Sequence, residues 1–125
     1  HTQRPASDSL KSIRDTLAQS NHSDAHIVDD AGRYIGTLTL QRLLHLVDDG
    51  VSFEEAVDHF AEPVSLQLHP DITIWEAMNA MQDFVGESIP VVEDGRLVGA
   101  LSESAIVSAY LDIVQGVRRE EHAAV

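Results

Sequence analysis

Apolar residues in the first half of the chain recur with two different spacings, which predict alternating helices and strands. Leu10, Ile13 and Leu17 are three or four residues apart, the spacing of one buried helix face. Between such stretches lie short apolar runs bounded by turn residues, a pattern typical of strands. The pattern predicts an opening strand within 2–6, a helix over 8–20, strands over 25–29 and 33–38, and a helix over 40–48.

The second half predicts the same order of elements. Thr73 is a residue type that caps helices, and the apolar positions after it, through Met81 and Val85, have helical spacing. The predicted elements are a strand over 64–68, a helix from residue 74, strands over 88–92 and 96–101, and a helix from 103 to about 118. Between the halves, residues 53–60 predict a short amphipathic connector.

These two halves are copies of one unit. The stretch from Ile27 to Thr39 recurs from Val91 to Ser102, at an offset of 64 residues before the turn and 63 after it. The apolar positions of the helix before it also match, since Leu10 corresponds to Ile74. A repeat of this length predicts two similar units that bury a shared surface.

Composition narrows the class of function. The chain has 125 residues, 43% of them hydrophobic, which is enough for a packed core. Its net charge of −13 argues against binding nucleic acid or anionic membranes. Without cysteine it has no disulfide, thiolate zinc site or cysteine nucleophile. No uncharged apolar run approaches the roughly 18 residues that span a bilayer. Because the chain begins at His1, we expect a fragment of a longer protein.

The hairpin motifs resemble a known family. The segment Pro90-Val91-Val92-Glu93-Asp94-Gly95-Arg96-Leu97-Val98-Gly99, with its weaker copy from His26 to Gly36, is similar to the hairpin of CBS domains. The resemblance implies a mixed α/β (α+β) fold of two β-α-β-β-α repeats, each with a three-stranded sheet, packed with pseudo-twofold symmetry. It implies a first domain over 1–49, a linker with a short helix over 50–63 and a second domain over 64–125. Such modules commonly pair, and the broad apolar faces over Leu40–Val47 and Ile106–Val117 exceed what one internal contact needs, so we expect a homodimer.

Further segments resemble the cytoplasmic tail of ClC-type chloride channels and transporters. They are the ending from Ala105 to Tyr110, the stretch from Gln19 to Leu43 and the linker from His59 to Asp71. This resemblance implies a regulatory domain at the cytoplasmic face of a membrane, following a transmembrane transport domain of the same chain. The alternative is an adenosine-nucleotide-sensing module of another host, such as a metal transporter or a soluble enzyme.

The family resemblance also implies a nucleotide cleft between the repeats. Its motif ends each hairpin with a hydroxyl for phosphate, here Thr39 and Ser102, followed three residues later by a ribose-binding carboxylate. That carboxylate is replaced by Arg42 in the first copy and Ala105 in the second. Both hydroxyls also have a structural role as helix N-caps. We therefore expect no tight cofactor: ATP, ADP or AMP binds no tighter than about 100 μM, near −5.5 kcal/mol, with Thr39, Arg42 and Ser102 as the candidate contacts.

Neither metal nor catalytic chemistry is predicted. The seven histidines do not cluster in sequence, and His22 and His26 fall in a loop and a strand. The adjacent carboxylates Asp29-Asp30 and Glu93-Asp94 fall in hairpin turns, where Asp and Gly are favoured without catalysis. No nucleophile elbow, P-loop or dinucleotide fingerprint is present. We expect a non-enzymatic module with no metal site.

Overall fold

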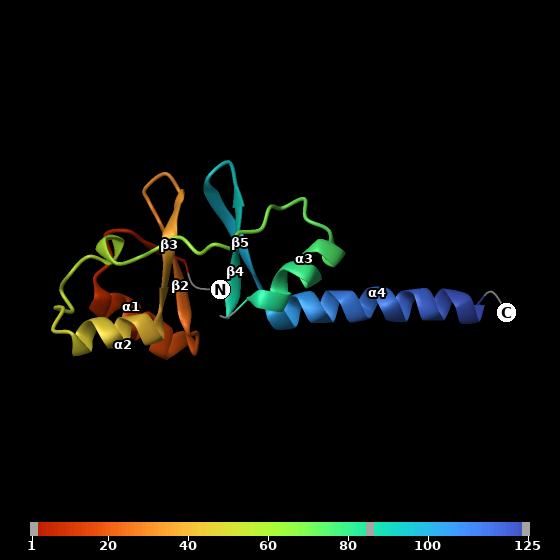
Figure 1. The fold of residues 1–125 in the computed structure, drawn as a ribbon, viewed down its shortest axis with the longest axis horizontal. Helices are drawn as coiled ribbons and strands as arrows, with labels where there is room; N and C mark the ends of the chain where they lie inside the picture. The colour runs from red at the N-terminus through yellow and green to blue at the C-terminus, as the bar shows by residue number, and fades with distance from the viewer. Residues whose placement is uncertain (1–2, 85–86, 124–125) are drawn as a thin grey trace.

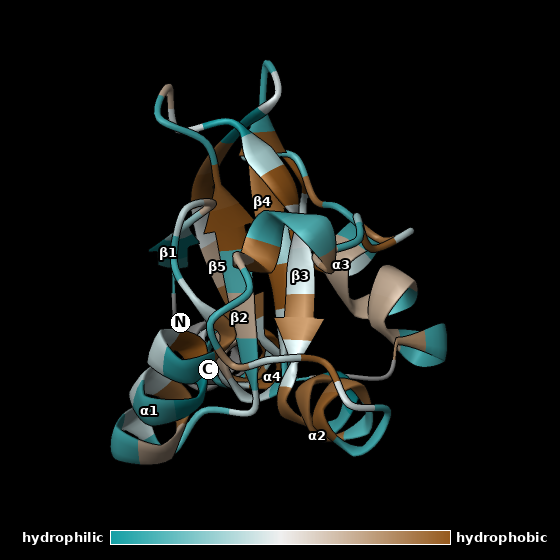
Figure 2. Cartoon of the chain, turned by 90° about the vertical axis from the view of Figure 1, so that its left-hand side faces the viewer, coloured by the Kyte–Doolittle hydropathy of each residue, from teal (hydrophilic) through white to brown (hydrophobic). Residues whose placement is uncertain are grey.

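The computed structural model describes residues 3–84 and 87–123, which form two units side by side (Figure 1). The first unit covers residues 3–61 and the second 64–123. Each unit has a hydrophobic core of its own, one built around Leu10, Ile27 and Leu43 and the other around Ile89 and Ile106. Strands β4 and β5 (residues 88–93 and 96–102) are mainly brown in Figure 2, whereas β1 (residues 3–5) and much of α1 (residues 10–20) are teal. The predicted mixed α+β fold of two repeats is confirmed.

The first unit is a three-stranded sheet with two main helices. Its elements are β1 (Gln3–Pro5), α1 (Leu10–Ser20), β2 (Asp24–Val28), β3 (Tyr34–Thr39), α2 (Leu40–Asp48) and the short 3-10 helix η1 (Val57–His59). β2 lies in the middle, parallel to β1 and antiparallel to β3. The predicted helix face of Leu10, Ile13 and Leu17 is fully buried against this sheet. Helix α1 begins two residues later than expected because Ser9 is its N-cap.

The second unit repeats this order from its first helix onward, without an opening strand among the described residues and with a longer final helix. Its elements are α3 (Ile74–Ala80), the 3-10 helix η2 (Met81–Asp83), β4 (Ser88–Glu93), β5 (Arg96–Ser102) and α4 (Glu103–Ala123). Thr73 caps α3 as expected, since its hydroxyl accepts the Glu76 N–H. The predicted helical position Val85 lies outside the described residues. Helix α4 is longer than predicted and extends beyond the rest of the unit (Figure 1).

The predicted strand over 64–68 is wrong except at Leu68. Leu68 makes a single parallel bridge to Val91, donating its N–H to the Pro90 carbonyl and accepting from the Val92 N–H. The next donor needed to extend this pairing toward Leu66 is the backbone nitrogen of Pro90, and proline has no N–H. The described second sheet therefore has two strands, β4 and β5, instead of the expected three.

A pseudo-twofold axis passes between the hairpin tips. The Tyr34 N–H donates to the Gly95 carbonyl at 2.9 Å, and the Leu97 N–H donates to the Gly32 carbonyl at 3.0 Å. These four residues are related in pairs by the 63-residue offset, and Arg33 faces Arg96 between them. We call the contacts between the two units the seam. It joins Ser23, Asp24, His26, Gly32 and Tyr34 to Val64, Glu87, Ser88, Gly95 and Leu97.

The linker between the units packs on the open edge of β3. Thr37 and Glu62 exchange two backbone hydrogen bonds there. A Cβ on Gly36 would lie 2.6 Å from the backbone of Glu62, so only glycine lets the linker approach this closely. The corresponding Gly99 on β5 has no described atom within 4 Å of such a Cβ.

Candidate functional site

Hydrogen bonds near the starts of β2 and β4 join the two units. The Asp24 carboxylate accepts from the Ser88 hydroxyl at 3.2 Å and from the Glu87 and Ser88 N–H groups at 3.4 Å. In return, the Glu87 carboxylate accepts from the Ser23 N–H and hydroxyl at 2.7 and 2.8 Å. Because Asp24 and Ser88 are both buried, losing either partner would leave a desolvated polar group.

His26 lies at the centre of the seam with its side chain fully buried. Its Nδ1 is 2.8 Å from the Thr37 hydroxyl and its Nε2 is 2.8 Å from the Ser88 hydroxyl. The Thr37 hydroxyl is also 2.7 Å from Tyr34 Oη, which accepts the Val64 N–H at 3.2 Å. Burial lowers the pKa of His26 below its ordinary value of 6.5, against an opposing attraction from Asp24. The ring is therefore neutral at physiological pH.

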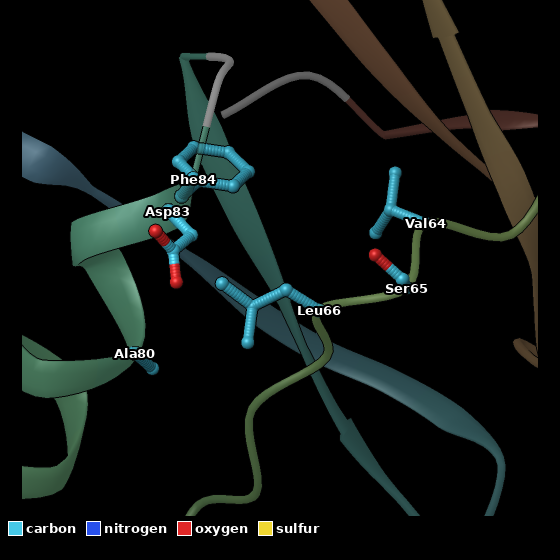
Figure 3. A pocket seen from close by; sticks show the side chains of 6 residues that line it. All are labelled: Val64, Ser65, Leu66, Ala80, Asp83 and Phe84. Atoms are coloured by element: carbon cyan, nitrogen blue, oxygen red, sulfur yellow. The ribbon is translucent and has the colours of Figure 1, made fainter.

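A cavity of about 470 Å³ lies beside the seam, between the 64–66 segment and the end of η2 (Figure 3). Its lining is mostly apolar, with one hydroxyl and one carboxylate: Val64, Ser65, Leu66, Ala80, Asp83 and Phe84. The Phe84 ring and the aliphatic side chains could cover a flat aromatic ring, and Asp83 could accept a hydrogen bond from an N–H or O–H group on that ring. This volume falls within the range of small-molecule pockets.

Ser102 lines a second cavity, of about 460 Å³, together with Glu87, Glu103, Ser104 and Val107. Burial raises the pKa of Glu87, but the two hydrogen bonds from Ser23 and the nearby His22 more than offset this, so the pKa is lowered. Glu87 is therefore anionic at neutral pH, and Glu103 adds a second carboxylate. This field opposes a phosphate group at the start of α4, even though helix starts favour anions.

The candidate residues Thr39 and Ser102 both cap helices, as predicted. The Thr39 hydroxyl accepts the Arg42 N–H and the Ser102 hydroxyl accepts the Ala105 N–H, each at 3.1 Å. The two residues lie opposite Asp24 and Ser88 in their hairpins, so they sit on either side of the seam. The Arg42 side chain is exposed. The structure does not bring Arg42 together with the residues of either cavity.

Metal and membrane elements are not found in the part of the chain that the structure describes. Within residues 3–84 and 87–123, no group of three His, Asp or Glu side chains is arranged to hold a metal ion. Among the same residues, no helix combines the length and the apolar character needed to cross a bilayer.

Comparison with protein-family models places this geometry in a family. The model of the CBS domain matches residues 5–49 and 57–112, so it covers most of the chain in two copies. The chain belongs to the CBS domain family. It is a tandem pair of these domains, as the hairpin motifs predicted.

One curated relative and many solved structures resemble this CBS pair. The relative is the A-adding tRNA nucleotidyltransferase of Aquifex aeolicus, which is 30% identical over 112 residues. The match covers 90% of this chain, which spans 12% of the length of that enzyme.

Two solved structures share the fold of the pair. CbpB in complex with c-di-AMP has a TM-score of 0.81 at 14% identity, over 95% of this chain and 82% of its own. Staphylococcus aureus OpuCA has a TM-score of 0.76 at 16% identity, over 90% of this chain and 94% of its own.

Sequence reasoning missed the His26 chain and the cavity residues Asp83 and Phe84. A comparison of the two CBS copies contained a signal for the first. His26, Tyr34 and Thr37 are polar or aromatic, whereas their counterparts are Pro90, Leu97 and Ala100. Polar residues in one copy at positions that are apolar in the other indicate a contact made by only one unit. The sequence pattern predicts a strand over 64–68, and nothing in that pattern indicates that residues 64–66 line a cavity.

Proposed function

We propose that this CBS pair is a non-catalytic regulatory module of a larger protein, in which the relative placement of the two units carries the signal. The observation that supports this proposal is the seam. Its contacts are polar and directional, with buried Asp24, His26 and Ser88 at their centre, and a cavity lies directly beside them. Polar contacts of this kind specify one arrangement and are sensitive to small changes in geometry.

Adenine nucleotides are proposed to bind only weakly. Among the described residues that line the two cavities, none is cationic, and Asp83, Glu87 and Glu103 are carboxylates. The ribose-binding carboxylate of the family motif is absent, since Arg42 and Ala105 occupy its positions. Losing a charge-assisted hydrogen bond costs about 1.5–3 kcal/mol, or one to two decades of affinity.

Calorimetric titration with ATP, ADP and AMP tests this proposal. We expect no saturable binding tighter than about 100 μM. Binding in the low micromolar range would overturn the weak-binding proposal. In that case the variant Ala105→Asp, which restores the missing carboxylate, should strengthen binding if the ligand lies in the cavity lined by Ser102. Asp83→Asn then tests whether the ligand lies in the cavity beside the seam.

Pairing of two copies is proposed as the second part of the function. Leu44 on α2 and Leu111 and Ile113 on α4 are about half exposed, although each is a large apolar side chain. Trp75 is 61% exposed and contacts Tyr110 edge to face, with ring centroids 5.3 Å apart. Exposed apolar side chains on the two helical surfaces favour a homodimer in which the helices are covered.

Two hosts are proposed for the module. The tail of a ClC-type chloride channel or transporter, at the cytoplasmic face of the membrane, is supported by the sequence resemblances at 19–43, 59–71 and 105–110. A nucleotidyltransferase-like enzyme is supported by the 30% identity to the Aquifex aeolicus protein, and we favour it because that match covers 90% of the chain. The adjoining gene sequence discriminates between them: several apolar helices upstream would support the transporter, and a nucleotide-transfer domain would support the enzyme.

A further inference from the structure

The donor and the acceptor of each hydrogen bond through His26 can be assigned from the groups at the two ends of the series, Asp24 and Val64. The Ser88 hydroxyl donates its one hydrogen to Asp24, so it must accept from His26, and Nε2 therefore carries the proton. In a neutral ring Nδ1 is then an acceptor, so the Thr37 hydroxyl donates to it. Thr37 in turn accepts from the Tyr34 hydroxyl, which matches the Val64 N–H donating to Tyr34 at the other end.

This chain of five hydrogen bonds crosses the seam three times. Val64 to Tyr34, His26 to Ser88 and Ser88 to Asp24 are contacts between the units. The second unit has no equivalent chain, because Pro90 and Ala100 stand at the positions of His26 and Thr37. The fold itself therefore does not require these polar residues. The first donor in this series of hydrogen bonds is the N–H of Val64, a residue that also lines the cavity beside the seam.

We propose that His26 is a pH-sensitive latch between the two CBS units. When His26 is neutral, it completes the hydrogen-bonded chain and holds the units in the arrangement of Figure 1. When His26 is protonated, the series of hydrogen bonds is interrupted and the two units separate at this end of the seam. The proposal depends on neither the identity of the host nor nucleotide binding.

Protonation breaks the chain at Thr37. A proton on Nδ1 turns this atom into a donor toward the Thr37 hydroxyl, which already accepts from Tyr34. Thr37 can then donate only toward Tyr34, so one of the two hydroxyl hydrogens of Thr37 and Tyr34 is left without an acceptor among these hydrogen-bonded groups. In addition, a positive charge is placed on a ring with no exposed surface, which is costly unless the structure opens to admit water.

Ionisable groups lie on several of the elements packed around the His26 ring. Asp24 on β2 and Glu87 before β4 attract the imidazolium and so raise the pKa of His26, but burial outweighs them and lowers it. Tyr34 on β3 lies edge to face with the ring, with centroids 6.3 Å apart. On β1, the charged residue Arg4 is paired with Asp8 at 2.6 Å, and Gln3 is the residue opposite His26. His22 lies beside Glu87.

Because burial outweighs the attraction of the carboxylates, the pKa of His26 is lowered, and the latch is expected to open below pH 6.5, the ordinary pKa of histidine.

The hairpin tips supply the pivot for this movement. The paired bonds between Tyr34 and Gly95 and between Leu97 and Gly32 involve only backbone groups, which do not titrate. Separation is therefore expected at the His26 end while the tips stay joined.

Spin labels measure the separation directly, since the chain has no cysteine of its own. Labels at Gln41→Cys on α2 and Ala109→Cys on α4 are placed on exposed positions, one in each unit. The labelled chain is diluted with unlabelled chain so that only distances within one chain are read. Between about pH 8 and pH 5, we expect the distance distribution to shift reversibly, with the same midpoint as the NMR titration of His26.

The variant His26→Gln should abolish the shift, and His45→Gln, an exposed histidine on α2, should leave it unchanged. If His26→Gln does not fold, the agreement of the two midpoints in the native sequence decides. ¹⁵N NMR at pH 8 should also show the proton on Nε2. The proposal is overturned if His26 titrates while the distance stays constant, if the shift persists in His26→Gln, or if His26 stays neutral until the chain unfolds.

Discussion

At the scale of single residues, the two repeats differ most clearly at a pair of equivalent glycines. Gly36 is needed because the backbone of Glu62 crosses it, whereas Gly99 has open space around it. Both belong to the same family motif, so the sequence alone gives them the same role. The difference arises because the linker, which follows only the first repeat, packs on β3. The linker has no counterpart in the second repeat, so comparing the repeats does not predict this contact.

Replacing Gly36 by alanine tests this difference. Gly36→Ala should lower the free energy of unfolding by about 1–3 kcal/mol, since its Cβ would overlap backbone atoms that cannot rotate away. The matched control Gly99→Ala should change stability by less than about 0.5 kcal/mol. Urea unfolding monitored by circular dichroism measures both variants. Equal effects at the two positions would contradict this reading of the linker.

His26 is a second residue whose role lay beyond sequence reasoning. The sequence placed it correctly in a strand. Its partner Ser88 is 62 residues away, and the pairing depends on how the two units meet. Periodicity predicts which residues share an element, but not which polar groups meet across a seam.

At the scale of elements, local chemistry predicted most of the boundaries. Helix starts at Thr39, Thr73 and Ser102 follow from hydroxyl residues that precede apolar stretches, and each hydroxyl accepts a backbone N–H in the structure. The strand over 64–68 failed because its composition is strand-like while its neighbour Pro90 lacks the N–H that pairing requires. Strand propensity concerns one segment, whereas a sheet needs a partner.

The cap of α2 gives a prediction at this scale. Thr39→Ala should destabilise the chain by about 1 kcal/mol, because the Arg42 N–H loses its acceptor. Thr39→Ser keeps a hydroxyl at the same place and should retain most of the stability. Thermal or urea unfolding compares the two variants. If serine and alanine are equally destabilising, the hydroxyl is not the cap that stabilises this helix.

At the scale of the whole molecule, stability should depend on pH in two steps. His26 has a lowered pKa in the folded chain, so the unfolded chain binds more protons as the pH falls through 6.5. Glu87 also has a lowered pKa, which adds a further loss as the pH falls through 4.5. The free energy of unfolding should therefore be highest above pH 6.5 and decrease in both ranges. Urea titrations at a series of pH values measure this.

Two variants separate the contributions to this profile. His26→Gln should flatten the decrease below pH 6.5 and leave the second decrease in place. Glu87→Gln should do the reverse, since it removes the carboxylate that accepts from Ser23. A profile that keeps its first step in His26→Gln would show that another group titrates there.

Assembly is the other property of the whole molecule. If the exposed apolar residues of α2 and α4 form a dimer interface, light scattering should give twice the mass of 13.7 kDa. Leu44→Glu together with Leu111→Glu should give the monomer mass, since both side chains are about half exposed and tolerate charge without unfolding. The exposed Val98→Glu on β5 serves as a control that keeps the dimer. A native chain that stays monomeric at high concentration would remove the basis for pairing.

The hydrogen bonds between the hairpin tips have a consequence for how such a pair can be assembled. Each unit contributes one donor and one acceptor there, related by a half-turn, so each tip is complementary to its own copy. A unit expressed alone therefore carries an isologous contact surface, and the covalent link acts mainly by raising local concentration. The hydrogen bonds from Val64 to Asp24, however, form only between one first unit and one second unit, so they favour the unlike pair over two like units. Two separated halves mixed in solution should accordingly prefer the unlike partner, which makes the pair a natural candidate for fragment complementation.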